Sequence, residues 1–362
     1  MQLESFRLYR FSLPLEVSLT VKGRKEDARQ GCLVAWRAEG QVQGWGEVSP
    51  LPGLSRESLE EAIEQVGEVC RTMVGQEVSM DAFWSGNLVP GRELYPSVEF
   101  GLETSLLDLF SKKSGLGLAT ILVDEPSSVV PVAGLLHGDH DAVLERARRL
   151  VAEGYSCLKL KVGRKDLQHE VKLVRALRDE LPKVVNLRLD ANRAWTLADA
   201  VWFSCEVGKD RIEFVEEPLQ DPRELPEFVG ETDVPIALDE TVAESGMKLV
   251  PRLSNLAAIV IKPTNVGGLR RVCGLAEQCW DAEVTPVISS SFESSVGLLA
   301  LANLAACVQG ADVAAGLGTR DCFQSDTMDP GFIIEKGSVD VAAFGRMLQW
   351  VVETGLEEVC HG

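Results

Sequence analysis

Short apolar runs recur along the chain from about residue 130, and helical patterns separate them. Eight runs start about 22 to 29 residues apart and cover residues 131–136, 157–162, 186–191, 213–218, 235–240, 258–263, 285–290 and 313–318. Regular alternation of strand and helix predicts parallel βαβ units, and eight units predict an α/β fold of the TIM-barrel type. A doubly wound open sheet is the alternative, but it would place a glycine-rich turn after the first strand, where the sequence reads LLHGDHD.

The first hundred residues have a different pattern. Residues 1–50 contain apolar runs with partial alternation, which predicts antiparallel strands. A loop rich in proline and glycine follows, and then a helix whose apolar residues recur from Leu59 to Met73, with Ser55 or Ser58 as its N-cap. A second helix is predicted from Ser97 to Lys113. Strands followed by helices without regular alternation indicate a small α+β domain.

Composition narrows the class of protein. Of the 362 residues, 45% are hydrophobic and 25% are charged, as in soluble globular proteins, and the length suggests two domains. The net charge is −19, so we expect no binding to nucleic acid or to an anionic membrane surface. The nine cysteines include no C-x-x-C pair, and the N-terminus lacks the apolar core of a signal peptide. We therefore expect a cytoplasmic protein with free thiols.

Charged residues end five consecutive predicted strands. In chain order they are Lys159 and Lys161, then Asp190 followed by Asn192, then Glu216 and Glu217, then Asp239 and Glu240, and finally Lys262. The carboxyl ends of barrel strands surround one mouth, where barrel enzymes build their active sites, so these side chains should converge. One acidic residue or lysine at a strand end is usually a solvated cap, but five successive strands with such ends indicate a functional site.

The acidic residues Asp190, Glu216 and Asp239 are spaced by one βα unit each. Three carboxylates in a partly buried mouth need a cation to stay ionised. Hard oxygen ligands without a cluster of cysteine or histidine favour Mg²⁺, with Mn²⁺ as a substitute. Lys161 and Lys262 would face each other across this metal. Neighbouring positive charge lowers the pKa of a lysine, so that it could act as a base near neutral pH.

Six ordered segments carry a resemblance to a known family. LKLKVG, LRLDANRAW, EFVEEP, ALDET, IVIKPTNVGG and VISSSFESSVG resemble the enolase superfamily in order and spacing, and in particular the o-succinylbenzoate synthases of its muconate lactonizing subgroup. The resemblance covers nearly the whole chain, including the loop WGEVSPLPGLS. It implies a modified barrel over residues 99–320, an N-terminal α+β capping domain over residues 1–98, and a C-terminal segment, residues 321–362, that returns to the capping domain.

The resemblance also implies roles for individual residues. The three acidic residues match the Mg²⁺ ligands. Lys161 matches the base that removes the proton α to the substrate carboxylate, and Lys159 matches its electrostatic neighbour. Lys262 matches an opposite lysine that stabilises the enediolate through a cation–π contact. The implied activity is the dehydration of a small dicarboxylate to o-succinylbenzoate, a carbon–oxygen lyase reaction of menaquinone or phylloquinone biosynthesis.

A second set of residues is expected around the substrate. Arg188 should share the inward face of Asp190, where it either holds the substrate anion or forms a structural ion pair inside the barrel. Glu293 is expected to orient a lysine, and residues 18–31 are expected to form a capping loop that closes over the site, or else a merely solvated charged loop. The remaining substrate-binding candidates are Asn192, Ser289, Ser290 and Gly316, the last because a missing side chain leaves space for a ligand.

Other activities stay open within the same superfamily. N-succinylamino acid racemase is the first alternative, followed by muconate cycloisomerase and dipeptide epimerase, which share the lysines and the metal ligands. Dipeptide epimerases carry Asp-x-Asp on the eighth strand, and AAGLGTRD lacks it at that position. A non-catalytic barrel is a remote alternative, because loss of function should first remove a ligand or a lysine. The protein is expected to be a monomer or a homo-oligomer.

Overall fold

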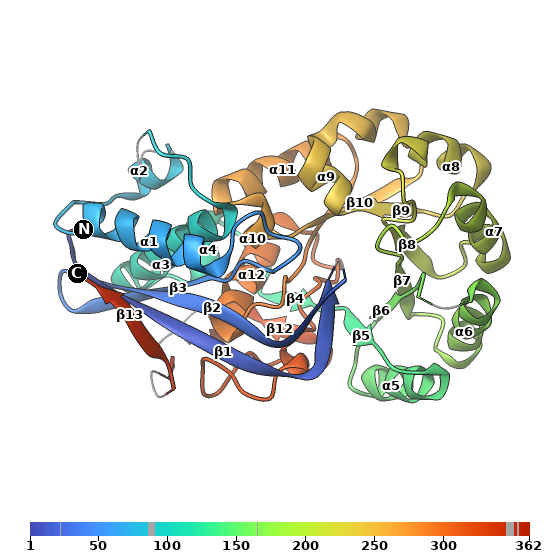
Figure 1. Cartoon of the computed structure of the whole chain (residues 1–362), viewed down its shortest axis with the longest axis horizontal. Helices are drawn as coiled ribbons and strands as arrows, with labels where there is room; N and C mark the ends of the chain where they lie inside the picture. Colours follow the sequence, from blue (N-terminus) through green and yellow to red (C-terminus); the bar gives the residue numbers. More distant parts are fainter. Residues whose placement is uncertain (22, 86–90, 165, 345–350, 353–354) are drawn as a thin grey trace.

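The computed structural model describes residues 1–21, 23–85, 91–164, 166–344, 351–352 and 355–362. An antiparallel sheet with its helices forms one side of the molecule, and a parallel barrel forms the other (Figure 1). The two ends of the chain lie together in the antiparallel sheet, because the last strand pairs with the first. This is the predicted fold, an enolase-like α/β barrel whose N-terminal sheet is completed by the C-terminal segment.

The antiparallel sheet forms the capping domain together with the helices that cover it. Its strands lie in the order β13 (Glu357–His361), β1 (Leu3–Val21), β2 (Arg24–Ala38) and β3 (Val42–Val48). Buried apolar residues of the sheet pack against the long helices α1 (Leu59–Met73) and α3 (Pro96–Ser114), and two short helices, α2 (Met80–Trp84) and α4 (Leu118–Leu122), follow them in the chain. Ser58, one of the two predicted N-caps, is the N-cap of α1 and forms a capping box with Glu61.

The segment expected to form a capping loop, residues 18–31, is a β-hairpin. Thr20 pairs with Lys25 and Val21 with Arg24, so that β1 and β2 stay hydrogen-bonded to the tip of the hairpin. Arg29, expected in a solvated loop, is buried, and its guanidinium donates to the carbonyls of Ser49 and Pro50. The described residues of this segment are therefore not an irregular loop, because strand pairing satisfies their backbone; Lys22 lies outside the described residues. That the segment closes over the site stays a prediction.

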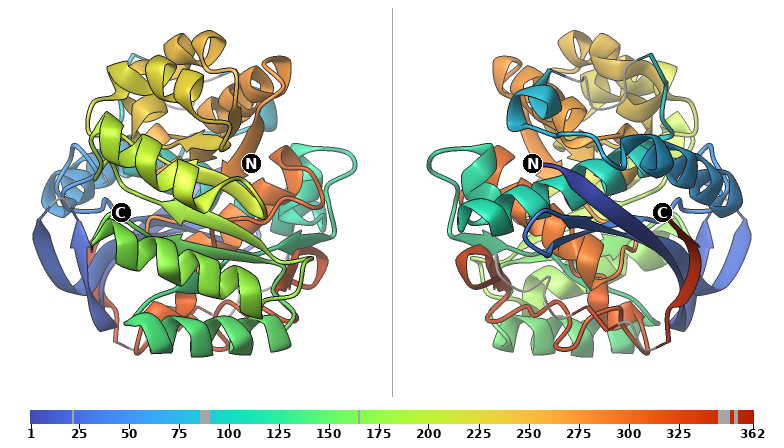
Figure 2. Two further views of the ribbon diagram at one scale, coloured as in Figure 1. Left: turned by 90° about the vertical axis from the view of Figure 1, so that its right-hand side faces the viewer. Right: turned by 90° about the vertical axis from the view of Figure 1, so that its left-hand side faces the viewer.

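The barrel contains seven of the predicted strands in one parallel sheet. They follow one another around the sheet as β5 (Gly134–Leu136), β6 (Cys157–Lys161), β7 (Asn186–Asp190), β8 (Ile212–Glu216), β9 (Ile236–Leu238), β10 (Leu256–Ile261) and β11 (Thr285–Ile288). The helices that follow these strands cover the outer face (Figure 2, left). They are α5 (His140–Ala152), α6 (Leu167–Glu180), α7 (Leu197–Val207), α8 (Leu225–Glu231), α9 (Glu240–Ser245), α10 (Pro263–Val266), α11 (Leu269–Asp281) and α12 (Ser295–Val308).

The eighth predicted strand, residues 313–318, closes the ring without forming a continuous strand. Gly316 makes a parallel bridge with Ser289, after β11, and Ala315 makes one with Val132, before β5. The remaining elements lie beside this closure or within the connections: the ribbon of β4 (Val129–Pro131) and β12 (Ser338–Asp340), the short helix α13 (Val341–Phe344), and 3₁₀ turns at Pro222–Glu224, Gly246–Arg252 and Arg320–Cys322.

Two buried helices join the capping domain to the barrel. Helix α3 contacts β3 on one side and α10 and α11 on the other, and residue 98, the predicted domain boundary, lies in its first turn. Helix α12 is apolar on nearly all sides and packs against β3, β11 and α4. Burial against protein on several sides explains its composition. No helix among the described residues is long and apolar enough to span a bilayer.

Candidate active site

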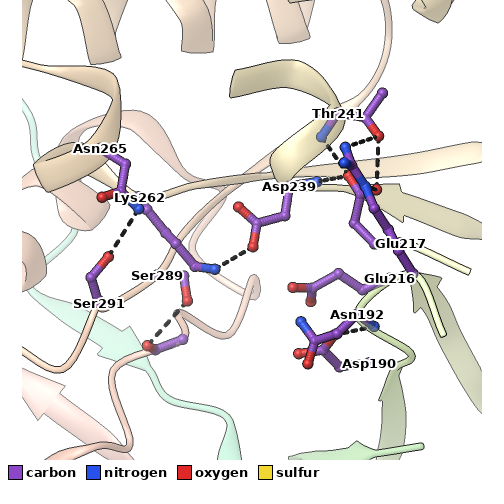
Figure 3. A network of polar contacts seen from close by, with 12 residues as sticks. Asp190, Asn192, Glu216, Glu217, Asp239, Thr241, Lys262, Asn265, Ser289 and Ser291 are labelled. Carbon is purple, nitrogen blue, oxygen red and sulfur yellow. Dashed lines mark hydrogen bonds and ion pairs between the residues drawn. The ribbon is translucent and has the colours of Figure 1, made fainter. Parts of the chain in front are cut away.

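The predicted site residues lie in one row at the carboxyl ends of the barrel strands. Lys161 at the end of β6 pairs with Asp190 at the end of β7, and Asp190 pairs with Glu216 at the end of β8. Asp239 and Lys262 follow β9 and β10 directly. The side chains of Asp190, Glu216, Asp239 and Lys262 project into a common space (Figure 3). The parallel register therefore brings together residues that are about 100 positions apart in the sequence.

Two of the three lysines form ion pairs with the acidic residues. Lys159 Nζ lies 2.9 Å from Asp190 Oδ2 and 2.7 Å from Glu216 Oε2. Lys262 Nζ donates to Asp239 Oδ2. Burial alone would lower the pKa of both lysines, but the neighbouring carboxylates outweigh it and raise both pKa values. Lys159 and Lys262 are therefore fixed positive charges at any ordinary pH.

The acidic residues titrate differently from one another. Burial raises the pKa of Glu216 to about 7, and the negative charge of Asp190 adds to this shift. Burial also raises the pKa of Asp239 to about 6, against the opposing charge of Lys262. At Asp190 burial acts in the same direction, but Lys159 and Lys161 outweigh it and lower the pKa. At Glu216 and Asp239 the neighbouring lysines therefore do not fully offset the effect of burial on the pKa, whereas at Asp190 they do.

Lys161 has a different environment from the other two lysines. Its Nζ donates to Asn192 Oδ1 at 3.0 Å, and no carboxylate of the described residues lies within ion-pair distance. Burial lowers its pKa, and the positive charges of Lys159, Arg164 and Lys262 act in the same direction, while Asp190 opposes them. Lys161 is therefore the lysine of the site that most readily becomes neutral, as a general base requires.

The donor set of the mouth fits a hard divalent cation. Asp190, Glu216 and Asp239 offer carboxylate oxygens, the ligands that Mg²⁺ and Mn²⁺ prefer. Glu216 Oε1 is buried and has no hydrogen-bond partner among the described residues, which leaves one oxygen of this set available for a ligand. Among the described residues no three acidic side chains close around a common point, because Lys159 and Lys262 lie against them. The oxygen ligands fit a divalent metal, and the ammonium groups of Lys159 and Lys262 neutralise part of the negative charge of the carboxylates.

Arg188 lies deeper in the barrel than the sequence led us to expect. Its terminal nitrogens donate to the Ala314 carbonyl and to Glu213 Oε1, each at 2.7 Å, and its guanidinium stacks over the Phe214 ring. Glu213 and Ala314 belong to the beginnings of their strands, at the opposite end of the barrel from the mouth. Of the two roles considered for Arg188, this geometry favours the structural ion pair over a contact with the substrate.

The residues that follow β11 form a compact hydrogen-bonded group. Ser290 Oγ donates to Glu293 Oε2 at 2.8 Å, and Glu293 Oε1 accepts from Thr264 Oγ1. Glu293 thus accepts hydrogen bonds from hydroxyls and from a backbone N–H, and from no lysine of the described residues. Glu293 instead ties the turn after Lys262 to the turn after β11.

Gly316 does not leave an open space for a ligand. A Cβ atom there would lie 2.4 Å from Ser289 Oγ, so the missing side chain makes room for Ser289. The hydroxyl of Ser289 lies 3.5 Å from the Gly316 carbonyl. Close packing of these two strand ends requires the glycine, and Ser289 is the residue whose hydroxyl borders the mouth (Figure 3).

The capping domain contributes one wall of a cavity that the sequence alone did not predict. This cavity, of about 320 Å³, extends from Asp239 and Lys262 to residues 54–57 of the capping domain. Ser55 of that loop donates to Asn265 Oδ1 at 3.1 Å, which joins the two domains beside Lys262. The two residues are 210 positions apart in the sequence, so the sequence pattern does not predict their contact. The proline- and glycine-rich composition of residues 50–53 indicates only an irregular connection.

Comparisons with known proteins agree with this architecture. The family model "Enolase C-terminal domain-like" matches residues 142–345, and "MenC, N-terminal domain" matches residues 3–109. The o-succinylbenzoate synthase of Yersinia pseudotuberculosis serotype I (strain IP32953) is 36% identical over 326 residues, which cover 89% of this chain and 92% of that protein.

Two solved structures share the fold at lower identity. The muconate lactonizing enzyme from Pseudomonas fluorescens complexed with muconolactone superimposes with a TM-score of 0.83 at 20% identity, over 99% of this chain and 97% of that one. The dipeptide epimerase from Enterococcus faecalis V583 complexed with Mg and L-Leu-L-Tyr gives a TM-score of 0.82 at 22% identity, over 99% and 100%. The chain therefore belongs to the enolase superfamily and, within it, to the o-succinylbenzoate synthase family.

Proposed function

We propose that this chain catalyses the Mg²⁺-dependent syn dehydration of 2-succinyl-6-hydroxy-2,4-cyclohexadiene-1-carboxylate to o-succinylbenzoate, a step toward menaquinone or phylloquinone. One observation carries the assignment of roles. Three lysines and three acidic residues surround one mouth. Among the described residues, Lys159 and Lys262 form ion pairs with carboxylates, and Lys161 forms none. One group is thereby available to take a proton, while the others provide fixed charge.

Lys161 takes the proton α to the substrate carboxylate. Its neutral form is accessible because burial and neighbouring cations lower its pKa. The hydrogen bond to Asn192 Oδ1 orients the amine within the mouth. In a syn elimination the proton and the hydroxide leave from one face of the ring, so the resulting ammonium of Lys161 is placed to return its proton to the departing hydroxyl. General acid–base catalysis of this kind contributes roughly 10²- to 10⁴-fold to the rate.

The other charged residues stabilise the negative charge that develops when the proton is removed. Asp190, Glu216 and Asp239 would hold the divalent cation, which supplies a positive charge next to the substrate carboxylate. Lys159 and Lys262 remain protonated and stay within reach of the same space, because their carboxylate partners fix them there. The two ammonium charges are in place before the reaction begins.

The second carboxylate of the substrate requires its own binding groups. Ser289 and Ser290 line the turn after β11, and we propose that the Ser289 hydroxyl contacts this end of the substrate. A separate cavity, lined by residues 54–57 and Lys262 but not by Ser289 or Ser290, borders the mouth on the side of the capping domain. We propose that the capping domain bounds the binding site on this side.

The direct test is conversion of the cyclohexadiene substrate, prepared in situ, followed by the loss of its absorbance with Mg²⁺ and after chelation of the metal. We expect rapid conversion that depends on the metal. A folded, Mg²⁺-loaded protein that fails to convert this substrate would contradict the proposed reaction. Exchange of the α proton of N-succinylamino acids in deuterated water would then support the racemase alternative.

A further inference from the structure

Two adjacent glutamates at the end of β8 project in opposite directions. Glu216 faces the mouth, and Glu217 faces away from it toward the end of β9 (Figure 3). Glu217 is 2% exposed, and the hydrogen bonds to its carboxylate use both oxygens. Such a buried, fully bonded carboxylate beside a candidate metal ligand calls for a specific role, because it is costly to bury unless its partners are fixed.

The carboxylate of Glu217 binds the backbone of the neighbouring strand end. Its Oε1 accepts from the N–H groups of Asp239 and Thr241, each at 2.8 Å. The backbone N–H of Glu217 itself donates to the Ala237 carbonyl at 3.0 Å. Three bonds therefore tie Glu217 to Asp239 itself and to Ala237 and Thr241, which lie two positions before and after it. The relative position of these two carboxylate-bearing strand ends depends on Glu217.

Arg193 extends this connection to a third strand end. Its Nε donates to Glu217 Oε2 at 2.9 Å, and one terminal nitrogen donates to Thr241 Oγ1 at 2.9 Å. The guanidinium also forms an ion pair with Glu244, and the backbone N–H of Arg193 donates to the Glu217 carbonyl at 2.7 Å. Because Arg193 follows Asp190 and Asn192 in the chain, the network joins the ends of β7, β8 and β9, which carry the three acidic residues.

The backbone of these turns is unusual. Asn192, Arg193 and Glu217 have φ angles of 44°, 59° and 43°, in the left-handed region that residues other than glycine seldom adopt. Such conformations persist only where surrounding contacts determine them, and they cluster at functional sites. Here the hydrogen bonds of Glu217 and Arg193 hold the two turns in this conformation. The unusual backbone and the hydrogen-bond network therefore depend on each other.

We propose that Glu217, oriented by Arg193, is a positioning residue that fixes Asp239 relative to Glu216 and thereby sets the affinity of the mouth for its divalent cation. The inference rests on the proposed function, in which Asp190, Glu216 and Asp239 hold the metal. Groups that hold metal ligands by hydrogen bonds typically change metal affinity by about 10- to 100-fold when they are replaced. Glu217 acts here through the Asp239 backbone and not on the substrate.

The test measures binding of Mn²⁺ to the free protein by electron paramagnetic resonance, without substrate. Glu217→Gln keeps the shape of the side chain, but its amide places N–H groups where a carboxylate oxygen now accepts. We expect the dissociation constant to rise about 10- to 100-fold. Thr241→Val removes a hydroxyl that donates to Glu217 Oε2 and accepts from Arg193. The other bonds of Glu217 remain, so we expect a smaller rise, of about 2- to 10-fold.

A matched control separates metal positioning from general stability. Asp108 is also a buried carboxylate; it accepts from the backbone N–H of Trp45 at 2.9 Å and from Lys112 at 2.8 Å, in the capping domain. We expect Asp108→Asn to lower the melting temperature and to leave Mn²⁺ affinity unchanged. Substitutions at Glu217 or Thr241 that lower only the melting temperature would overturn the inference, and Thr241→Val decides if Glu217→Gln does not fold. A wild-type protein that binds no Mn²⁺ would overturn the proposed function together with the inference.

Discussion

The two ends of the barrel both contain buried charge, and they use it differently. At the beginnings of the strands, one cation, Arg188, meets one anion, Glu213, and the guanidinium stacks on Phe214. At the ends of the strands, Lys159 and Lys262 form ion pairs with the three acidic residues, Lys161 stands apart from these pairs, and Glu216 Oε1 has no donor among the described residues. Arg188 Nε also has no hydrogen-bond partner among the described residues, but its N–H group cannot bind a cation, whereas a carboxylate oxygen can. The unmatched acceptor distinguishes the reactive end from the structural end.

Replacing Lys161 should have the largest effect on the reaction. We expect Lys161→Ala to lower kcat by at least roughly 10²- to 10⁴-fold, because the acid–base contribution is lost. The exposed residue Lys183 provides the control, and Lys183→Ala should retain wild-type turnover. Steady-state kinetics at saturating Mg²⁺ measure both variants. Wild-type turnover by a folded Lys161→Ala protein would show that the base is another group.

Breaking the ion pair at the other end should change stability and spare the reaction. Glu213→Gln leaves the charge of Arg188 buried without its counter-charge. Removing one partner of a buried pair costs about 3 to 5 kcal/mol, and we expect the lower end of this range because the Glu213 side chain is 29% exposed. Urea unfolding gives the loss of stability, and kcat/KM should change little. A large fall in kcat/KM with unchanged stability would instead support a substrate contact for Arg188.

The pH dependence of metal binding tests the charge balance of the mouth. Glu216 has a pKa of about 7 and Asp239 of about 6, both raised above the ordinary range by burial. Protons therefore compete with the metal as the pH falls through 7 and then 6. We expect the Mg²⁺ dissociation constant of the free protein to rise roughly tenfold from pH 8 to pH 6, measured by calorimetric titration. A constant affinity across this range would mean that these carboxylates do not bind the metal.

The smallest effect is expected in the capping domain, at the start of α1. Ser58→Ala removes the capping box of α1, and caps of this kind contribute about 1 kcal/mol. Thermal unfolding should show the loss, while KM and kcat stay at wild-type values. A change in KM would show that the position of α1 is coupled to the substrate cavity, and the separation between structural and reactive regions would need revision.

Much of the barrel could be predicted because its sequence pattern is regular. Apolar runs at regular spacing gave the strands and their direction, and the polar residues at their ends gave Asp190, Glu216 and Asp239 as candidates. The period of two residues along a strand assigned Arg188 to the inner face correctly. It could not show that the side chain reaches toward the beginnings of the strands, where a register shift between β7 and β8 places Glu213.

The contacts between distant segments could not be predicted in this way. Glu216 and Glu217 have the same chemistry, and only the backbone at the end of β8 determines which one faces the mouth. The fit of Ser289 into the space beside Gly316 depends on the packing of two strand ends 27 residues apart. The charged residues of the segment 18–31 obscure the pairing of β1 with β2, so the sequence predicts a loop where the structure has a hairpin.

The central claim is that Asp190, Glu216 and Asp239 hold the divalent cation opposite Lys161. Anomalous diffraction from crystals grown with Mn²⁺ tests it most directly. We predict one strong peak at the mouth, within coordination distance of an oxygen from each of the three carboxylates, with Lys159 and Lys262 beside it. A peak held by other residues, or a mouth without a peak in crystals that bind Mn²⁺ elsewhere, would contradict the account.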